Sequence, residues 1–352
     1  MITIDGSDGG GQMLRTALAL STITQKPFSM INIRGNRNNP GLKPQHLTCI
    51  DAIKKITGAT CDAKLNDKEI IFTPGKINKT KEDINIGTAG SITLLLQSLV
   101  PILIYSKKIS NFNIIGGTDV NWSPSIDYYK EVILNALSSH AEFKLKILKR
   151  GFYPKGGGQI NIMIKPKKEF PKVNLTERGN LVQVIGTSLA SKDLSEKEVC
   201  ERIKKNEEVL LKEVKHSKLI QAAYADTFSI GVITTLVAKY EKVSIGSDVL
   251  GEKEISSEEI GTLCAKKLLE RMHSNAICDE HLTDNLIPYI GLFGGEIITD
   301  KITNHIKTNI EITNMFLDKK IIIEEIVDEE KTNEVNSSEK ENKTIIKIKR
   351  EE

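Results

Sequence analysis

The sequence predicts an α+β fold built from one recurring unit, with a segment of different character inserted into it. The unit is a short strand, a glycine-rich turn, an apolar helix and a second strand, and it recurs over residues 2–35, 83–117 and 280–327. Helices of this size between strand-rich segments are typical of a repeated α+β module. Residues 182–275 instead carry charged amphipathic helices and few glycine turns. We therefore predict a large domain of residues 1–181 and 276–352 and a smaller inserted α/β domain of residues 182–275.

Composition and charge exclude several classes of protein. The chain has 352 residues, of which 39% are hydrophobic and 27% charged, as in an ordinary α/β protein. Its 49 basic residues nearly balance 46 acidic ones, which excludes a purely electrostatic nucleic-acid binder but not a local basic groove. The five cysteines form no C-x-x-C pair, and the first stretch, MITIDGSDGG, shows no signal peptide. We therefore expect a cytoplasmic location.

Glycine-rich turns precede the helices of the first two copies. The stretch IDGSDGGGQMLR predicts a strand and then a helix opened by Gln12, whose free N–H groups form either an anion site or an ordinary turn. The stretch IRGNRNNPGLKPQHL places Arg34 and Arg37 on a constrained loop, which suits either phosphate capture or simple solvation. In IGTAGSITLLLQ, Gln97 lies on an apolar helix face and is either a structural hydrogen bonder or a ligand contact.

Three later segments complete the predicted fold. The apolar run SITLLLQSLVPILIY is too short to cross a bilayer and predicts a buried helix that breaks at Pro101. The glycines of RGFYPKGGG indicate either close approach of a ligand or a hairpin. The polar stretch of residues 328–343 predicts a mobile loop, after which residues 344–350 would return as an edge strand paired with residues 319–327.

A lone histidine in the stretch ITNHIKTNIEI is the candidate nucleophile. Thr308 and Glu311 match a capping box, which predicts that a helix starts just after His305. The positive end of that helix favours the neutral, nucleophilic imidazole. The sequence contains no serine nucleophile elbow, HExxH motif or Walker motif that would compete. The alternative is a loop histidine satisfied by its neighbours.

Taken in series, GGGQMLR, IRGNRNNPGLKPQHL, GTAGSITLLLQ, GGTD, RGFYPKGGG, ERGN and HLTDNLIP resemble the RNA 3′-terminal phosphate cyclase family over about residues 2–327. The resemblance implies a large domain of repeated βαβαββ modules with a smaller α/β domain inserted. It also implies a ligase that uses ATP to convert an RNA 3′-phosphate into a 2′,3′-cyclic phosphate, through a covalent histidine–AMP intermediate and an RNA-adenylate. The histidine of the family's His-x-x-Thr-Asn-Ile segment falls on His305.

The same resemblance implies the remaining site residues. The nucleotide- and phosphate-binding side chains would be Gln12, Arg15, Arg34, Arg37, Gln45, Gln97, Pro124, His281, Asp284 and Asn285. ATP and an RNA with a 3′-phosphate end would be the substrates, and Mg²⁺ or Mn²⁺ would neutralise the polyphosphate. The family usually has a glutamate in a longer Gly-Glu-Gly-Gly-Gly turn. Here Asp8 is the nearest carboxylate and becomes the expected metal ligand.

Two alternatives to an active cyclase follow from related proteins. One is the cyclase-like branch that binds RNA in ribosome biogenesis without catalysis. That branch lacks the nucleophilic histidine, so His305 together with Arg34 and Arg37 argues against it. The other is an enolpyruvyl-type transferase, which shares the repeated module and would form no covalent nucleotide.

Overall fold

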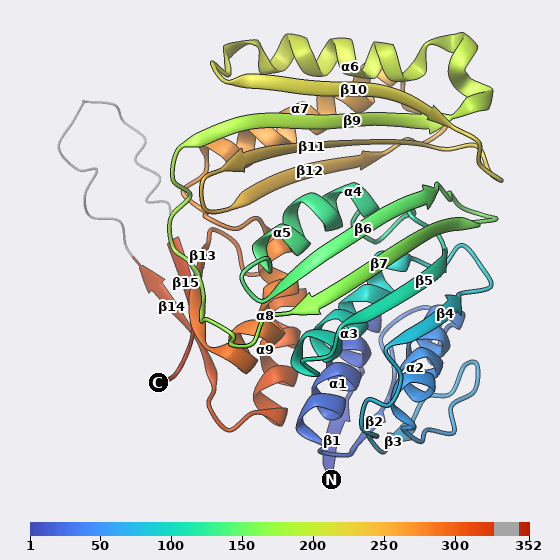
Figure 1. The fold of residues 1–352 in the computed structure, drawn as a ribbon, viewed down its shortest axis with the longest axis vertical. Helices are drawn as coiled ribbons and strands as arrows, with labels where there is room; N and C mark the ends of the chain where they lie inside the picture. The colour runs from blue at the N-terminus through green and yellow to red at the C-terminus, as the bar shows by residue number, and fades with distance from the viewer. Residues whose placement is uncertain (327–344) are drawn as a thin grey trace.

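The computed structural model describes residues 1–326 and 345–352 and confirms the α+β prediction. Within these residues the strands form four sheets (Figure 1). The predicted loop of residues 328–343 lies outside the described residues. No helix among the described residues is long and apolar enough to cross a membrane.

Three of the sheets repeat one order of elements. The first holds β1 (Ile2–Asp5), α1 (Gly11–Thr24), β2 (Phe28–Ile31), α2 (Pro44–Thr57) and β3 (Ile70–Phe72). The second holds β4 (Lys81–Asn85), α3 (Ile92–Tyr105), β5 (Ser110–Gly116), α4 (Ile126–Tyr128), a π-helical turn (Tyr129–Ile133), α5 (Leu134–Ala136), β6 (Ala141–Lys149) and β7 (Gly158–Pro166). The third holds β8 (Val173–Leu175), α8 (Glu280–Phe293), β13 (Gly295–Thr299), α9 (Asn304–Phe316), β14 (Ile321–Ile326) and β15 (Ile345–Arg350).

The pairing of strands shows the repeat. In each copy the first two strands are parallel, as for β1 with β2, β4 with β5 and β8 with β13. The second strand then pairs with an antiparallel one: β3, β7 or β15. Within the described residues, the first copy has three strands where the others have four. In place of the fourth strand it has only an isolated bridge between Thr60 and Thr73. The second and third copies therefore have the βαβαββ order expected from the family resemblance.

The fourth sheet comes from the inserted segment. Its elements are β9 (Leu181–Ser191), a 3₁₀ turn (Lys192–Lys197), α6 (Val199–Leu210), a second 3₁₀ turn (Leu211–Glu213), β10 (Ser217–Ala225), β11 (Val232–Tyr240), β12 (Ser244–Leu250) and α7 (Ser257–His273). The strand order is β10-β9-β11-β12, and α6 and α7 pack on this sheet at the top of Figure 1. The predicted boundaries of residues 182–275 remain a proposal.

Three expectations about single elements were wrong. The third copy begins with β8, which lies before the inserted segment and pairs with β13, whereas the sequence placed its start at residue 280. β15 does pair with β14, but it lies between β14 and β13 and is not an edge strand. Helix α3 does not break at Pro101, and it continues to Tyr105. Proline removes only the bond to the carbonyl four residues earlier, and the fully buried side chains around it hold the helix together.

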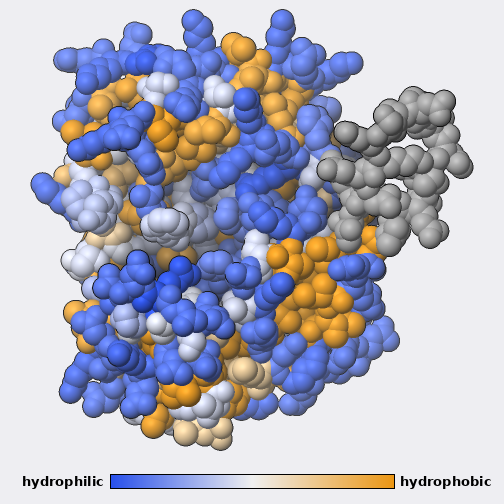
Figure 2. Space-filling view, turned by 180° about the vertical axis from the view of Figure 1, so that it is seen from behind, coloured by the Kyte–Doolittle hydropathy of each residue, from blue (hydrophilic) through white to orange (hydrophobic). Residues whose placement is uncertain are grey.

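The main hydrophobic core lies where the helices of the repeats meet. α1 packs against α2, α3 and α9, and α8 packs against α9 and α3. Leu14, Ala17 and Leu18 of α1 and Leu95, Leu96 and Leu99 of α3 are at most 1% exposed. Figure 2 shows the resulting surface from behind, where hydrophilic residues cover much of the face and hydrophobic residues gather in separate patches. This packing brings helix starts from different copies together.

Candidate functional site

A small pocket opens where α1, α3, α8 and α9 meet. Its lining includes five of the predicted residues, namely Gln12, Arg15, Gln97, Asp284 and Asn285. Gln12 and Arg15 lie in the first turns of α1, because the helix begins at Gly11 directly after the glycine-rich turn. The pocket therefore collects polar side chains from the first, second and third copies.

His305 is tied to this pocket by a hydrogen-bonded relay. Gln12 Nε2 donates to Asp284 Oδ1 at 2.5 Å and to the His305 carbonyl oxygen at 2.8 Å. Because both partners are acceptors, the amide orientation of Gln12 is fixed and its Oε1 faces His305 Nδ1. Oε1 can only accept, so Nδ1 carries the proton. The lone pair of the ring is then on Nε2, for which the described residues provide no hydrogen-bond partner.

His305 occupies the first turn of α9 and does not precede it. The helix begins at Asn304, and the side chain of Thr303 caps it by accepting from the Ile306 amide at 3.2 Å. The predicted capping box was wrong: Thr308 lies inside the helix, where its hydroxyl donates to the Asn304 carbonyl oxygen at 2.9 Å. The electrostatic reasoning is unchanged, because the second residue of a helix also lies at its positive end.

Charge and burial keep the His305 imidazole neutral. Partial burial of the ring is the largest cause that lowers its pKa, followed by the positive charges of Arg15 and Arg37 and by His281. The opposite happens to Asp284, where burial raises the carboxyl pKa to about 7 despite hydrogen bonds from Asn309 and Gln12 and the charge of Arg15. At neutral pH, Gln12 thus connects the Asp284 carboxyl group, which titrates near pH 7, with the uncharged imidazole of His305.

Gln97 has structural partners on both sides of its amide. It accepts from Arg15 Nε at 2.9 Å and donates to Asn285 Oδ1 at 2.9 Å. Asn285 in turn donates to the His281 carbonyl oxygen at 2.8 Å. Gln97 is therefore a structural hydrogen bonder that also lines the pocket, and its contact with a ligand stays a prediction. These bonds set the orientation of Arg15, whose guanidinium pKa is lowered because the group is buried.

A basic loop folds over the glycine-rich turn. The Arg34 amide donates to the Gly6 carbonyl oxygen at 3.0 Å, and the Asn36 amide donates to the Ser7 carbonyl oxygen at 3.1 Å. Arg34 has a left-handed backbone with φ of 56°, and its pKa is lowered by burial and by the nearby charge of Arg37. Two like charges held close together by the backbone favour binding of an anion between them.

The remaining predicted residues lie around this centre. Gln45 opens α2, and its Nε2 is buried without a hydrogen-bond partner among the described residues. The carbonyl oxygen of Pro124 accepts from Thr93 of α3 at 2.9 Å. His281 is an exposed residue of the first turn of α8. An orphaned buried amide such as that of Gln45 is the kind of group that a ligand oxygen satisfies.

Asp8, the predicted metal ligand, lies next to the loop that carries Arg34 and Arg37. It is exposed, and its carboxylate accepts from Asn36 Nδ2 at 2.6 Å. The described residues hold no cluster of three or more His, Cys, Asp or Glu side chains that could cage a metal ion. A single carboxylate beside a phosphate site does fit Mg²⁺ or Mn²⁺ that is held mainly by substrate phosphates and water.

Sequence reasoning missed three side chains that complete the site. Asn309 donates to Asp284 Oδ1 at 2.8 Å and accepts from Thr16 Oγ1 at 2.6 Å. Its position four residues after His305 places both on one face of α9, which is a signal that could have been used.

The third missed side chain is His46, which packs under Gly11. A Cβ added at Gly11 would lie 2.3 Å from His46 Nε2. Burial and the charges of Arg15, Arg34 and Lys43 lower the His46 pKa to about 3, so it stays neutral.

Comparison with known proteins identifies the family. A family model described as RNA 3′-terminal phosphate cyclase matches residues 7–323. The protein of that name from Pyrococcus abyssi is 41% identical over 323 residues, which cover 91% of this chain and 94% of that protein. The one from Methanococcoides burtonii is 42% identical over 333 residues, covering 92% and 97%. The one from Saccharolobus solfataricus is 41% identical over 332 residues, covering 92% and 96%. Because these matches span nearly the whole chain, it belongs to the RNA 3′-terminal phosphate cyclase family.

Proposed function

We propose that this chain uses ATP to convert an RNA 3′-terminal phosphate into a 2′,3′-cyclic phosphate, with His305 as the covalent nucleophile. Family membership supports the overall reaction, since the relatives described above are named for it. It also argues against an enolpyruvyl-type transferase. The observation that carries the covalent step is the tautomer of His305, because Gln12 holds the proton on Nδ1 and leaves Nε2 available.

The first step transfers AMP to the protein. His305 Nε2 attacks the α-phosphorus of ATP, a P–N bond forms, the bond from that phosphorus to the bridging oxygen breaks, and pyrophosphate leaves. The imidazole gains positive charge as the bond forms, and Gln12 Oε1 stabilises it by accepting from Nδ1. No proton has to move in this step. The guanidiniums of Arg15, Arg34 and Arg37 would orient the phosphate oxygens.

The second and third steps use the RNA. An oxygen of the RNA 3′-phosphate attacks the phosphorus of the adenylate, the P–N bond breaks, and His305 returns as a neutral leaving group. The vicinal 2′-hydroxyl then attacks the RNA phosphorus and loses its proton to water. The bond from that phosphorus to the bridging oxygen breaks, which gives the cyclic phosphodiester and free AMP. A divalent cation, Mg²⁺ or Mn²⁺, would reduce the negative charge on the polyphosphate, with Asp8 as its expected protein ligand.

The deciding experiment follows AMP transfer from α-labelled ATP. Wild type and His216→Asn should both become labelled, because His216 is an exposed residue next to β10 and serves as the matched control. His305→Asn should carry no label. The label should be acid-labile, as expected for a phosphoramidate, and should pass to a 3′-phosphorylated RNA that then resists phosphatase. Label retained by His305→Asn would show that another residue is the nucleophile.

A second candidate function is binding without catalysis. A cyclase-like RNA-binding protein of ribosome biogenesis would bind RNA and leave its ends unchanged. Failure of the wild-type chain to acquire AMP in the presence of Mg²⁺ or Mn²⁺ would favour it.

We also propose a cytoplasmic location for the protein. Its five cysteines are all free and buried, which fits a reducing compartment.

A further inference from the structure

Three aromatic side chains stand out from the surface on neighbouring loops. Trp122 is 96% exposed, Tyr153 is 73% exposed and Phe228 is 57% exposed. They belong to the loops of residues 117–125, 150–157 and 226–231, which join β5 to α4, β6 to β7 and β10 to β11. Large aromatic side chains usually bury most of their area, so three of them in adjoining loops require an explanation.

The three loops form one connected scaffold. An isolated bridge joins Asp119 to Phe152, and the Thr118 amide donates to the Gly151 carbonyl oxygen at 2.9 Å. The Lys155 amide donates to Ser229 Oγ at 3.0 Å, which ties the hairpin of β6 and β7 to the inserted sheet. These contacts hold the three loops together on both sides of the junction between the second copy and the insertion.

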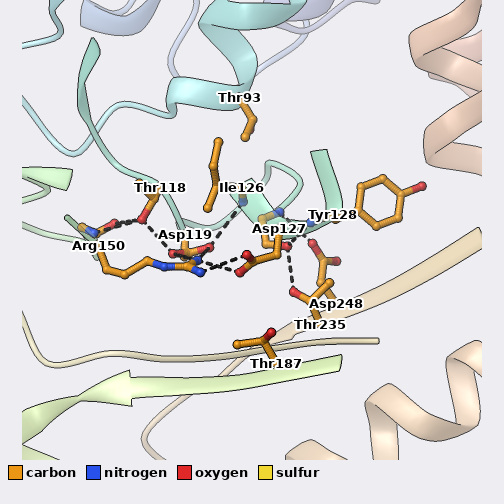
Figure 3. A network of polar contacts seen from close by, with 12 residues as sticks. Thr93, Thr118, Asp119, Ile126, Asp127, Tyr128, Arg150, Thr187, Thr235 and Asp248 are labelled. Atoms are coloured by element: carbon orange, nitrogen blue, oxygen red, sulfur yellow. Dashed lines mark hydrogen bonds and ion pairs between the residues drawn. The ribbon is translucent and has the colours of Figure 1, made fainter. Parts of the chain in front are cut away.

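A buried ion-pair cluster supports the loop that carries Trp122. Arg150 contacts both Asp119 and Asp127, and the side chains of Arg150 and Asp119 are 9% and 0% exposed (Figure 3). Ser125, which follows Pro124, is held by Asp248 and Thr235 of the inserted sheet through bonds of 2.7 and 2.9 Å. Trp122 itself has φ of 67°, a strained value for a tryptophan, which persists where the surroundings fix the backbone.

The aromatic side chains have basic neighbours. Lys149 Nζ lies 3.5 Å from the ring centroid of Phe228, and Lys155 is exposed two residues after Tyr153. Of the two carboxylates in these loops, Asp226 is exposed, whereas Asp119 is buried and paired with Arg150. Exposed rings interspersed with lysines match a chain of flat bases joined by phosphates.

The loops of Trp122 and Tyr153 are linked to helix α3, which lines the pocket through Gln97. Trp122 is two residues from Pro124, whose carbonyl oxygen is bound by Thr93, and Thr93 lies one turn before Gln97 on α3. Gly156 of the hairpin packs on the turn that leads into α3, where a Cβ would lie 2.8 Å from Ala89 Cα. Both loops therefore pack against the helix, or the turn before it, that carries Gln97 into the pocket.

We propose that Trp122, Tyr153 and Phe228 form a stacking track for the single-stranded RNA nucleotides that precede the 3′-terminal phosphate. This inference rests on the proposed function for its substrate. Base–aromatic stacking tolerates any sequence, because every base has a π-face, so the track selects an unpaired strand and not a particular sequence.

The single tryptophan of the chain gives a direct probe. Its fluorescence reports Trp122 alone, and a base stacked on the ring should quench it. Titration of the wild-type chain with a single-stranded oligouridylate that ends in a 3′-phosphate should quench the fluorescence, whereas ATP alone should not. Quenching by ATP without quenching by RNA would place Trp122 in the nucleotide pocket and overturn the proposal.

Variants separate stacking from folding and from adenylylation. Trp122→Ala and Tyr153→Ala should each weaken RNA binding about 5- to 150-fold, the range of one stacked base, while Trp122→Phe should restore binding. Tyr105→Ala is the matched control, since Tyr105 is 47% exposed at the far end of α3. Unchanged RNA affinity in Trp122→Ala with a native circular dichroism spectrum would refute the track. AMP labelling in the absence of RNA tests the proposed function, and RNA binding tests the track. The two results are independent, because RNA affinity can be measured whether or not the chain acquires AMP.

Discussion

Replacing Arg150 by methionine should destabilise the protein strongly, because it leaves buried carboxylates without a counter-charge. Arg150 Nη1 lies 3.2 Å from Asp119 Oδ2 and 2.7 Å from Asp127 Oδ2, and Nη2 donates to Asp127 Oδ1 at 2.9 Å. Methionine fills much of the same space but carries no charge. Breaking a buried pair by removing one partner costs about 3–5 kcal/mol, so we expect the free energy of unfolding to fall by that amount.

Denaturant unfolding followed by circular dichroism measures this loss, and the chain offers a matched control. Arg202 forms a two-bond pair with Glu258, with distances of 2.6 and 2.7 Å, but both side chains are largely exposed. Arg202→Met should therefore change the unfolding midpoint little, because water screens the exposed pair. Equal and small shifts in the two variants would refute the reasoning.

A third variant tests whether uncompensated charge is the cause. Neutralising the whole cluster with Arg150→Met, Asp119→Asn and Asp127→Asn should recover much of the loss, because no buried charge then lacks a partner. If this variant is as unstable as Arg150→Met, lost packing and hydrogen bonds explain the effect instead.

The pH dependence of Arg150→Met gives an independent check. Burial already raises the Asp119 pKa in the wild type, and loss of Arg150 removes the largest influence that lowers it. A carboxyl group whose folded pKa exceeds its unfolded value binds more protons in the folded state, so its contribution to stability declines as pH rises. The deficit of Arg150→Met relative to wild type should therefore shrink when the pH is lowered toward the raised Asp119 pKa.

Two further predictions concern chemistry at the site. The rate of AMP transfer to His305 should fall to half its maximum at a pH below 6.5, the ordinary pKa of a histidine, because burial and the charges of Arg15 and Arg37 lower the pKa of this imidazole. A midpoint at or above pH 6.5 would contradict this reasoning. Arg34→Ala should weaken phosphate binding about tenfold or more, the typical effect of losing a charge-assisted hydrogen bond, with little change in the unfolding midpoint. Melting at a much lower temperature would assign Arg34 a structural role.

The parts of the fold that could be predicted from the sequence are those set by local pattern. The helices that follow the glycine-rich turns, α1 and α3, begin where the sequence predicts them, although α3 continues past Pro101. Pairing partners were harder, since alternating residues in β15 indicate one solvated face but not which strands lie beside it. β8 has only three residues and is separated from its helix by the insertion, so no local repeat could reveal it.

The same distinction between local pattern and long-range contacts applies to the site. Gln12 and Gln97 could be singled out because each lies on a helix that follows a glycine-rich turn, whereas Arg15 was named by the family resemblance. Asn309 was harder to predict: its spacing places it on the same face of α9 as His305, but its role depends on contacts with Asp284 and with Thr16, which is 293 residues away in sequence. Side chains that position other side chains leave little pattern in a single sequence.

The orientation of the nucleophile depends on two copies of the repeat at once. Gln12 comes from α1 of the first copy, whereas Asp284 and His305 come from α8 and α9 of the third. The insertion divides the third copy between β8 and α8. Its loop with Phe228 contacts the hairpin of β6 and β7 and contributes to the proposed RNA track. One inserted segment can therefore contribute to binding the RNA without disturbing the helices that orient His305. Substitutions in the loop of residues 226–231 should thus change RNA affinity and leave AMP transfer from ATP intact.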